Sequence, residues 1–335
     1  MRTLELDKGD AGSVAPDTER SAAPTRLTSD DPSSVVVGDA EATRIRQTLY
    51  RTDESALATI VPAFRQDLDP ADIARFNELG YFAMEGLLSP IEVADCKAAI
   101  SDLIARKDEL GDQIWVQEEP VFEQGRAATA DGDPELRVRK LARFLKANGR
   151  LAAAARHPRL MGLLDQLIGP GHRLIQDMAL MKPPFKGSEK PWHQDNAYFD
   201  WTPLDGILGV WIALDEATVE NGCMQIIPGS HLEGPVPHYH VRDCQLADQG
   251  VDVERIEVVP LTPGGVLFFA GLIHHGTPAN QGASRRRALQ FHYAAARCRR
   301  MTFAEHMANF SDGAFYTGCR DWDMEAGVSR AILEA

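Results

Sequence analysis

Hydrophobic and polar positions follow two different patterns along the chain, and the change falls near residue 170. Before that point the apolar residues recur at helical spacing, as in Val93, Cys96, Ile100, Leu103 and Ile104, which share one helical face. The pattern predicts a helix from Asp69-Pro70 to about Gly80 and a second from Ser89-Pro90 to Gly111, because a capping side chain precedes a proline at each start. A third helix is predicted over 150–168, ended by Gly169-Pro170.

After residue 170 the chain consists of short β-type runs separated by proline and glycine. The predicted strands are 173–181, 207–214, 223–227, 265–274 and 288–295. Asn221-Gly222 predicts a hairpin turn before Cys223, because this dipeptide tolerates the positive φ that such turns require. Helices followed by many strands favour a mainly β fold with flanking helices, in which a sandwich or barrel is buttressed by the N-terminal helices.

The N-terminal segment differs in composition from the rest of the chain. Residues 1–40 contain no aromatic side chain, and their eight acidic residues outnumber four basic ones. Such a segment cannot bury enough apolar surface to offset its ordering entropy. We therefore predict a flexible, disordered tail over residues 1–60, with a partner-dependent arm as the alternative, and a single domain over residues 61–335.

Composition narrows the class of protein further. The chain has 335 residues, of which 44% are hydrophobic and 25% charged, as in ordinary globular proteins. Its formal charge of −14 argues against binding to nucleic acid or to anionic lipid, both of which require surplus lysine and arginine. No apolar run approaches the roughly 20 residues that span a bilayer. The oligomeric state cannot be read from the sequence.

The first residues and the cysteines indicate the cellular compartment of the protein. The first residues, MRTLELDKGD, lack the apolar stretch of a secretory signal. The five cysteines are an odd number, widely spaced, and contain no Cys-x-x-Cys pair. This pattern favours reduced thiols over a disulfide framework or a zinc ribbon. We therefore expect a cytoplasmic protein.

One short segment has the spacing of a metal site. In an extended strand, His193 and Asp195 point to the same side, so that an imidazole and a carboxylate can meet at one cation. His274-His275 offers a third ligand from a distant strand. Two histidines and one carboxylate leave three positions open on an octahedral metal, which is the arrangement of non-haem Fe(II) oxygenases. Taken alone, His-x-Asp is common among surface and hydrogen-bonded polar residues. A second pair with this spacing, His238 and His240, is predicted to lie in a loop.

Arg285, Arg286 and Arg287 follow the strand that holds His275. Three consecutive arginines are usually solvated, and alternation along a strand allows only one or two of them to point inward. An inward arginine requires an anion, since an unpaired buried charge is costly, and a guanidinium binds a carboxylate through two parallel hydrogen bonds.

These segments, in this order, resemble the phytanoyl-CoA dioxygenase family of Fe(II)- and 2-oxoglutarate-dependent oxygenases over about residues 80–296. The resemblance rests on six motifs: Met181-Lys-Pro-Pro184, Trp192-His-Gln-Asp-Asn-Ala-Tyr-Phe199, Asn221-Gly-Cys223 through Pro228-Gly-Ser-His231, Gly264-Gly-Val-Leu-Phe-Phe269, His275-Gly-Thr277 through Asn280, and Arg286-Arg-Ala288. It implies a double-stranded β-helix, a jelly-roll or cupin-like barrel.

The resemblance also implies roles for particular residues. His193, Asp195 and His275 would be the iron ligands, and His274 would be structural, because Gly276, Thr277 and Asn280 fit the family spacing only from His275. Arg286 would bind the distal carboxylate of 2-oxoglutarate with help from Thr277, while Arg285 and Arg287 face outward. The family would also place four residues around the cosubstrate: Lys140, Met178, Gln194 and Trp211. Each has a structural alternative, namely a surface lysine, core filling, a strand exterior and sandwich core. His231 lies in a family motif that a Pro-Gly turn largely explains.

The implied activity is oxidation of a C–H bond of a small organic molecule, with Fe(II), 2-oxoglutarate and O2, releasing succinate and CO2. Because Asp195 is present, hydroxylation is favoured over halogenation, in whose enzymes a small residue replaces the acidic ligand. The alternatives are an acyl-CoA 2-hydroxylase, a catalytically silent small-molecule-binding barrel, and a zinc hydrolase using the same ligands.

Overall fold

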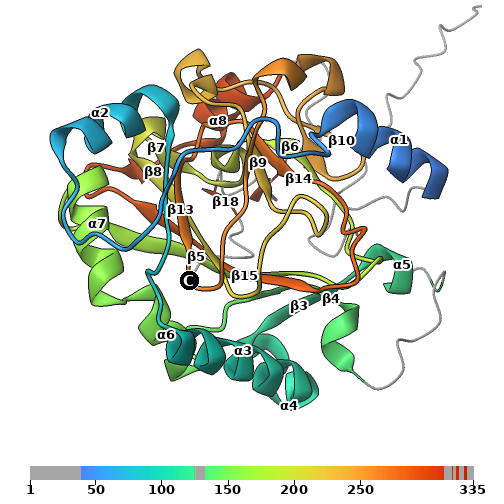
Figure 1. The fold of residues 1–335 in the computed structure, drawn as a ribbon. Helices are drawn as coiled ribbons and strands as arrows, with labels where there is room; N and C mark the ends of the chain where they lie inside the picture. Colours follow the sequence, from blue (N-terminus) through green and yellow to red (C-terminus); the bar gives the residue numbers. More distant parts are fainter. Residues whose placement is uncertain are drawn as a thin grey trace, which may run out of the picture.

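The computed structural model describes residues 39–123, 125, 133–312 and 319, together with the backbone of 322–323 and 328–329. Most of the predicted N-terminal tail, residues 1–38, lies outside this range. The described chain forms two main β-sheets, and most of its helices lie around the larger one (Figure 1).

The larger sheet has eight strands, and each pair of neighbours is antiparallel except β1 with β2. Its order is β1 (Ile60–Val61), β2 (Tyr81–Met84), β13 (Val266–Ala270), β8 (Ile207–Ala213), β15 (Arg286–Ala294), β5 (Arg173–Lys182), β4 (Val138–Ala142) and β3 (Trp115–Glu118). The smaller sheet has the order β12 (Glu257–Val259), β9 (Met224–Ile226), β14 (His275–Thr277) and β6 (Lys190–His193). Three two-stranded pairs complete the β-structure: β10 (Tyr239–His240) with β11 (Cys244–Gln245), β7 (Trp201–Thr202) with β16 (Arg299–Arg300), and β17 (Trp322–Asp323) with β18 (Val328–Ser329). The two main sheets form the expected double-stranded β-helix.

The helices are α1 (Asp39–Leu49), α2 (Pro70–Leu79), α3 (Pro90–Ala105), α4 (Lys107–Leu110), α5 (Pro120–Glu123), α6 (Gly149–Ala155), α7 (Pro158–Ile168) and α8 (Phe303–Phe310). Two of them begin where the sequence predicted. The Asp69 carboxylate accepts hydrogen bonds from the first-turn amides of α2, and the Ser89 hydroxyl accepts one from the Glu92 amide of α3. A proline follows each cap, so both predicted starts are confirmed.

The alternation of side chains along β15 separates the core from the space between the sheets. Leu289, Phe291 and Tyr293 belong to the core that the larger sheet shares with α3, α6 and α7. The intervening positions, such as Ala288, face the smaller sheet. There, Trp211 and Phe269 of the larger sheet pack with residues of β9 and β12. One face of each central strand therefore fills the core, and the other lines the interior where polar side chains gather.

Several predicted boundaries are wrong. The helix predicted over 150–168 is two helices, because Pro158 lacks an amide hydrogen and disfavours the helical conformation of His157 before it. The second predicted helix ends at Ala105, before the short α4. Gly222 has the positive φ of 87° expected of a turn, but β8 and β9 lie in different sheets and form no hairpin. Strands β3, β4 and β6 were not predicted.

The predicted boundary of the tail at residue 60 is also wrong. Helix α1 lies within it, and its Ile45 packs in a buried cluster with Tyr50 and Trp192. The rings of Tyr50 and Trp192 stack at 5.6 Å, and Trp192 Nε1 donates to the Leu49 carbonyl at 2.8 Å. Because Trp192 precedes His193, this segment supports the strand that carries the candidate metal ligand.

The prediction of reduced cysteines is wrong for one pair. Cys244 and Cys319 form a disulfide with a Cα–Cα separation of 5.4 Å, which is within the range of native disulfides. Two cysteines 75 residues apart gave no sequence signal of pairing. Cys96, Cys223 and Cys298 are free and buried.

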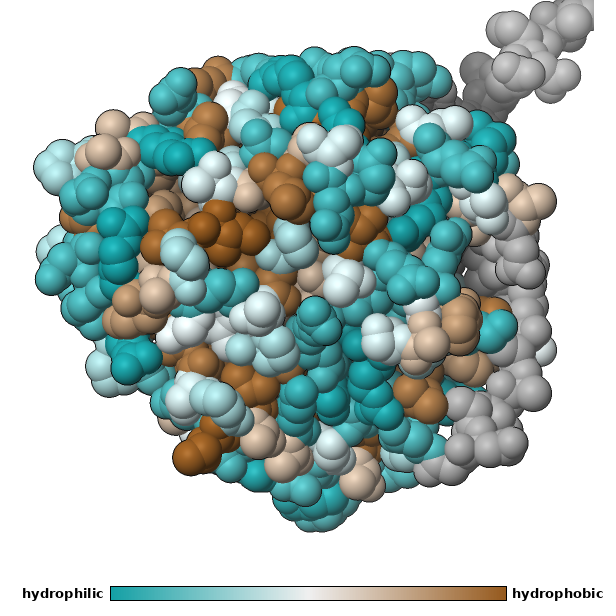
Figure 2. Space-filling model, in the orientation of Figure 1, coloured by the Kyte–Doolittle hydropathy of each residue, from teal (hydrophilic) through white to brown (hydrophobic). Residues whose placement is uncertain are grey.

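In the described part of the chain, the helices are too short or too polar to cross a membrane. On the face drawn in Figure 2, hydrophobic side chains lie in small groups among hydrophilic ones.

Candidate metal and cosubstrate site

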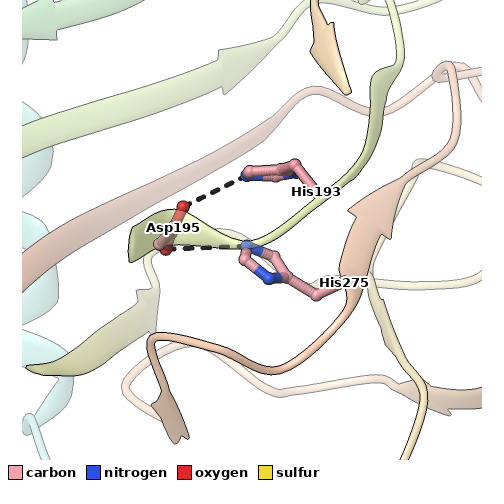
Figure 3. Close-up of side chains that lie close together, drawn as sticks. All are labelled: His193, Asp195 and His275. Carbon is pink, nitrogen blue, oxygen red and sulfur yellow. Dashed lines mark hydrogen bonds and ion pairs between the residues drawn. The ribbon is translucent and has the colours of Figure 1, made fainter. Parts of the chain in front are cut away.

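Three buried side chains converge at the end of β6 and the start of β14. His193 and His275 are paired across these strands, and their ring centres are 4.2 Å apart. Asp195 begins the short 3-10 helix that follows β6, and it faces both rings (Figure 3). Its Oδ1 lies 3.1 Å from His193 Nε2, and its Oδ2 lies 3.6 Å from His275 Nε2. One potential ligand atom of each residue lies within 4.8 Å of the others, so a single ion could contact all three.

Backbone carbonyls set the tautomer of both histidines. His193 Nδ1 lies 2.8 Å from the Pro191 carbonyl oxygen, and His275 Nδ1 lies 3.1 Å from that of Ile273. A carbonyl only accepts, so each Nδ1 carries the hydrogen and each Nε2 presents a lone pair to the space beside Asp195. Metal-binding histidines are oriented in this way.

The electrostatic environment suits a divalent cation. Burial lowers the pKa of His193, and burial next to His193 lowers that of His275 to about 3, so both rings are neutral near pH 7. Burial would raise the pKa of Asp195, but the neighbouring imidazoles of His275, His292 and His193 hold it well below its usual value. Two neutral imidazoles and one carboxylate are the donor set of a 2-His-1-carboxylate iron site.

Arg286 lies in the same pocket and provides the second feature of a cosubstrate site. Its side chain is 2% exposed, and Nε and Nη1 have no hydrogen-bond partner among the residues that the structure describes. The pocket that it lines also includes His193, Asp195 and Thr277. Burial lowers the pKa of Arg286 to about 10, which leaves it charged at neutral pH. A buried guanidinium with two free donors fits a carboxylate, as the distal group of 2-oxoglutarate requires.

The remaining predicted cosubstrate residues divide into two groups. Lys140 and Met178 line the pocket, and burial lowers the pKa of Lys140 to about 7. Trp211 lies beside Arg286, whose guanidinium carbon is 5.3 Å from its ring centre. Gln194 does not reach the pocket. Its amide donates to the carbonyls of Gly234 and Leu272 and accepts from the Val236 amide, so it is a structural residue that orders the chain after β6.

The arginine alternation is confirmed. Arg285 pairs with Asp133 and Glu135, and Arg287 pairs with Asp215 and Glu135, both outside the pocket. Only the central Arg286 lines the pocket.

The other histidines that the sequence singled out lie elsewhere. His274 is buried outside the pocket, and its backbone amide donates to Ser230 Oγ. His231 Nε2 lies 3.0 Å from the Asn77 carbonyl oxygen. His238 is buried, and its Nε2 accepts from the Gln194 amide at 2.9 Å. The predicted loop around His238 and His240 includes the short strand β10.

Two residues that contact Asp195 were missed. His292 Nε2 lies 2.6 Å from Asp195 Oδ2, and Gln290 Nε2 donates to the same oxygen at 3.2 Å. Both follow Arg286 on β15 at even spacing, four and six residues later, and therefore share its face. The two-residue period of this strand was the signal that could have found them.

A double-stranded β-helix with this triad and a buried arginine defines the class of non-haem iron oxygenases. The sequence model described as "Phytanoyl-CoA dioxygenase (PhyH)" matches residues 76–288, so the chain belongs to the phytanoyl-CoA dioxygenase family. It is a 2-oxoglutarate-dependent non-haem iron dioxygenase.

Comparison with individual proteins agrees with this assignment. Phytanoyl-CoA dioxygenase domain-containing protein 1 of Danio rerio is 27% identical over 261 residues, covering 67% of this chain and 89% of its own. Among solved structures, EctD from S. alaskensis with 2-oxoglutarate and 5-hydroxyectoine gives a TM-score of 0.56 at 23% identity, covering 75% of this chain and 86% of its own. The epimerase SnoN with Fe3+, alpha ketoglutarate and nogalamycin RO gives 0.55 at 23% identity, covering 76% and 95%. These two likenesses establish the fold.

Proposed function

We propose that this dioxygenase hydroxylates a C–H bond of a small organic molecule in tailoring or secondary metabolism, with release of succinate and CO2. The observation that carries the proposal is that Arg286 lines the same pocket as His193 and Asp195, which form an intact triad with His275. A zinc hydrolase would leave Arg286 unexplained, and a silent binding barrel would not need the triad. Asp195 occupies the ligand position that a halogenase would leave to chloride.

Each residue has a defined task in this proposal. His193, Asp195 and His275 hold Fe(II) through Nε2 and carboxylate oxygen atoms, and Arg286 with the Thr277 hydroxyl binds the distal carboxylate of 2-oxoglutarate. Lys140 adds a positive charge on the adjoining wall. When bound, iron with 2-oxoglutarate and O2 supplies the oxidising chemistry. Met178 and Phe199, both buried in the pocket wall, exclude water from the reacting centre.

We infer that the described residues from Asp39 onward act as one domain in the cytoplasm. The support for one domain is that α1 packs against the strand that carries His193. The support for the location is that Cys96, Cys223 and Cys298 are free and buried, although Cys244 and Cys319 are paired. The acidic charge of the chain argues against a nucleic-acid or anionic-lipid partner, and the pocket supports a small-molecule substrate.

The test is a substrate screen by succinate release, in which Fe(II)-loaded protein receives 2-oxoglutarate, O2 and a panel of amino acids, terpenoids, alkaloids and acyl-CoA thioesters. A product one oxygen heavier, formed by the wild type and not by Asp195→Ala, supports the proposal. An acyl-CoA as the preferred substrate would favour the alternative, an acyl-CoA 2-hydroxylase. Chlorination of a product, or turnover that Asp195→Ala retains, would contradict the assigned role of Asp195.

A further inference from the structure

His292 is a buried histidine that the proposed iron ligation does not use. It is 1% exposed and lies on β15, on the strand face that also carries Arg286 and Gln290. Its ring centre lies 4.8 Å from that of Phe199 and 6.1 Å from that of Phe269. Both neighbours are apolar, and they fix the ring without offering it a hydrogen bond.

The polar contacts of His292 go to one residue only. Among the described residues, its Nδ1 has no partner, and its Nε2 lies 2.6 Å from Asp195 Oδ2. A carboxylate only accepts, so Nε2 carries the hydrogen and donates it. Burying an imidazole with half of its hydrogen-bonding capacity unused is unfavourable. A purely structural histidine would be better satisfied, as His238 is by the Val236 carbonyl and the Gln194 amide.

The two oxygens of Asp195 have different surroundings. Oδ2 receives the hydrogen bonds of both His292 and Gln290 and lies 3.6 Å from His275 Nε2, whereas Oδ1 lies 3.1 Å from His193 Nε2 and receives neither bond. We propose that His292, assisted by Gln290, is a positioning residue that occupies Oδ2 and so makes Asp195 a one-oxygen ligand through Oδ1. This inference rests on the iron site proposed above.

The consequence concerns the number of open metal positions. An octahedral metal with three protein ligands leaves three positions, and the cosubstrate and O2 require all of them. A carboxylate that binds through both oxygens would take one of these positions. Hydrogen bonds to the second oxygen prevent this, and outer partners of metal ligands typically contribute about 10- to 100-fold in metal affinity.

The test uses Co(II) binding to the metal-free protein, followed by calorimetry and by the visible spectrum of the bound ion. His292→Phe keeps a ring between Phe199 and Phe269 but removes the donor, and Tyr293→Phe is the matched control. Tyr293 is the next residue, faces the opposite side of β15, and donates to the Ala155 carbonyl. We expect His292→Phe to weaken Co(II) binding about 10- to 100-fold and to change the spectrum, with Tyr293→Phe like the wild type.

If His292→Phe does not fold, a second pair of variants still tests the inference. The Gln amide reaches about as far as Nε2, whereas the Asn amide is too short, so His292→Gln should bind Co(II) nearly as the wild type and His292→Asn weakly. Wild-type affinity and spectrum in His292→Phe, or equal affinity in the Gln and Asn variants, would overturn the inference. A wild type that binds no Co(II) would instead count against the iron site itself.

Discussion

The guanidinium carbon of Arg286 lies 5.3 Å from the centre of the Trp211 ring, and within the described part of the chain Nε and Nη1 of the same side chain have no hydrogen-bond partner. The indole ring lies beside the charge, and Arg286 lines the same pocket as His193 and Asp195. A buried guanidinium in this pocket is available to bind a carboxylate of the cosubstrate.

Replacing Arg286 is therefore expected mainly to weaken the binding of 2-oxoglutarate. Arg286→Ala removes a charge-assisted contact worth about 1.5–3 kcal/mol, so KM for 2-oxoglutarate should rise about 10- to 100-fold. The measurement is succinate release as a function of 2-oxoglutarate concentration. Arg285→Ala is the matched control, because the neighbouring arginine pairs with Asp133 and Glu135 outside the pocket. Equal KM values for the two variants would exclude the assigned role.

The choice between adjacent histidines can be tested directly. His275→Gln should reduce iron binding and turnover by more than about 100-fold, because it removes a metal ligand and not merely an outer partner. His274→Gln should leave both close to wild type, because His275, not His274, clusters with His193 and Asp195. Iron content after desalting and succinate release are the two readouts. Loss of iron in His274→Gln, with retention in His275→Gln, would reverse the assignment.

The lowered pKa of Lys140 predicts that the binding of 2-oxoglutarate depends on pH. Burial lowers its pKa to about 7, with Asp243 opposing this shift and Lys190 and Arg139 adding to it. The protonated lysine exists below this pH and attracts the anionic cosubstrate, so affinity is expected to fall as pH rises through 7 and beyond. The apparent Kd should increase by up to about tenfold per pH unit over this range.

The control for this prediction is Lys140→Met, which cannot titrate. Its Kd for 2-oxoglutarate, measured anaerobically in the Fe(II) complex between pH 6 and 8.5, should be weaker at low pH and nearly flat. A wild-type slope in Lys140→Met would assign the pH dependence to another group.

Packing behind the triad gives a stability prediction. A Cβ at Gly209 on β8 would meet the ring of Phe269, whose centre lies 4.9 Å from that of His275. Gly209→Ala should therefore lower the free energy of unfolding by about 1–3 kcal/mol, as overpacking does, and weaken metal binding as the Phe269 ring shifts. Gly149→Ala, at a position with open space around the new Cβ, should change stability little. Urea unfolding of both variants is the measurement, and equal midpoints would contradict the packing argument.

The parts of the site predictable from the sequence are those that a two-residue strand period controls. This period places Arg286 inward between two outward arginines. It also extends to Gln290 and His292, which were missed because their partner, Asp195, lies in a different part of the chain. Gln194 could not be placed by the period, because β6 ends at His193 and the chain turns there. Its side chain instead satisfies backbone groups from two loops distant in sequence.

In the fold as well, features with a local sequence signal were predicted, and features that depend on distant contacts were not. Capping residues determined the starts of α2 and α3, because that signal is local. Helix α1 was assigned to the tail because the composition of residues 1–40 was extended to residue 60. The contacts that order the helix come from distant residues such as Trp192, more than 140 residues away, and the carbonyls of Val219 and Ala279, which bind Arg46. The pairing of Cys244 with Cys319 also depends on the fold and not on spacing.

The most direct measurement is an anaerobic titration of the metal-free protein with Fe(II) and then 2-oxoglutarate, followed by visible absorption. We predict that a weak charge-transfer band develops only when both are present, at one equivalent of each, and that it is lost in His275→Ala. Absence of the band in wild-type protein, with Fe(II) not retained, would contradict the account and leave a barrel that binds a ligand without iron.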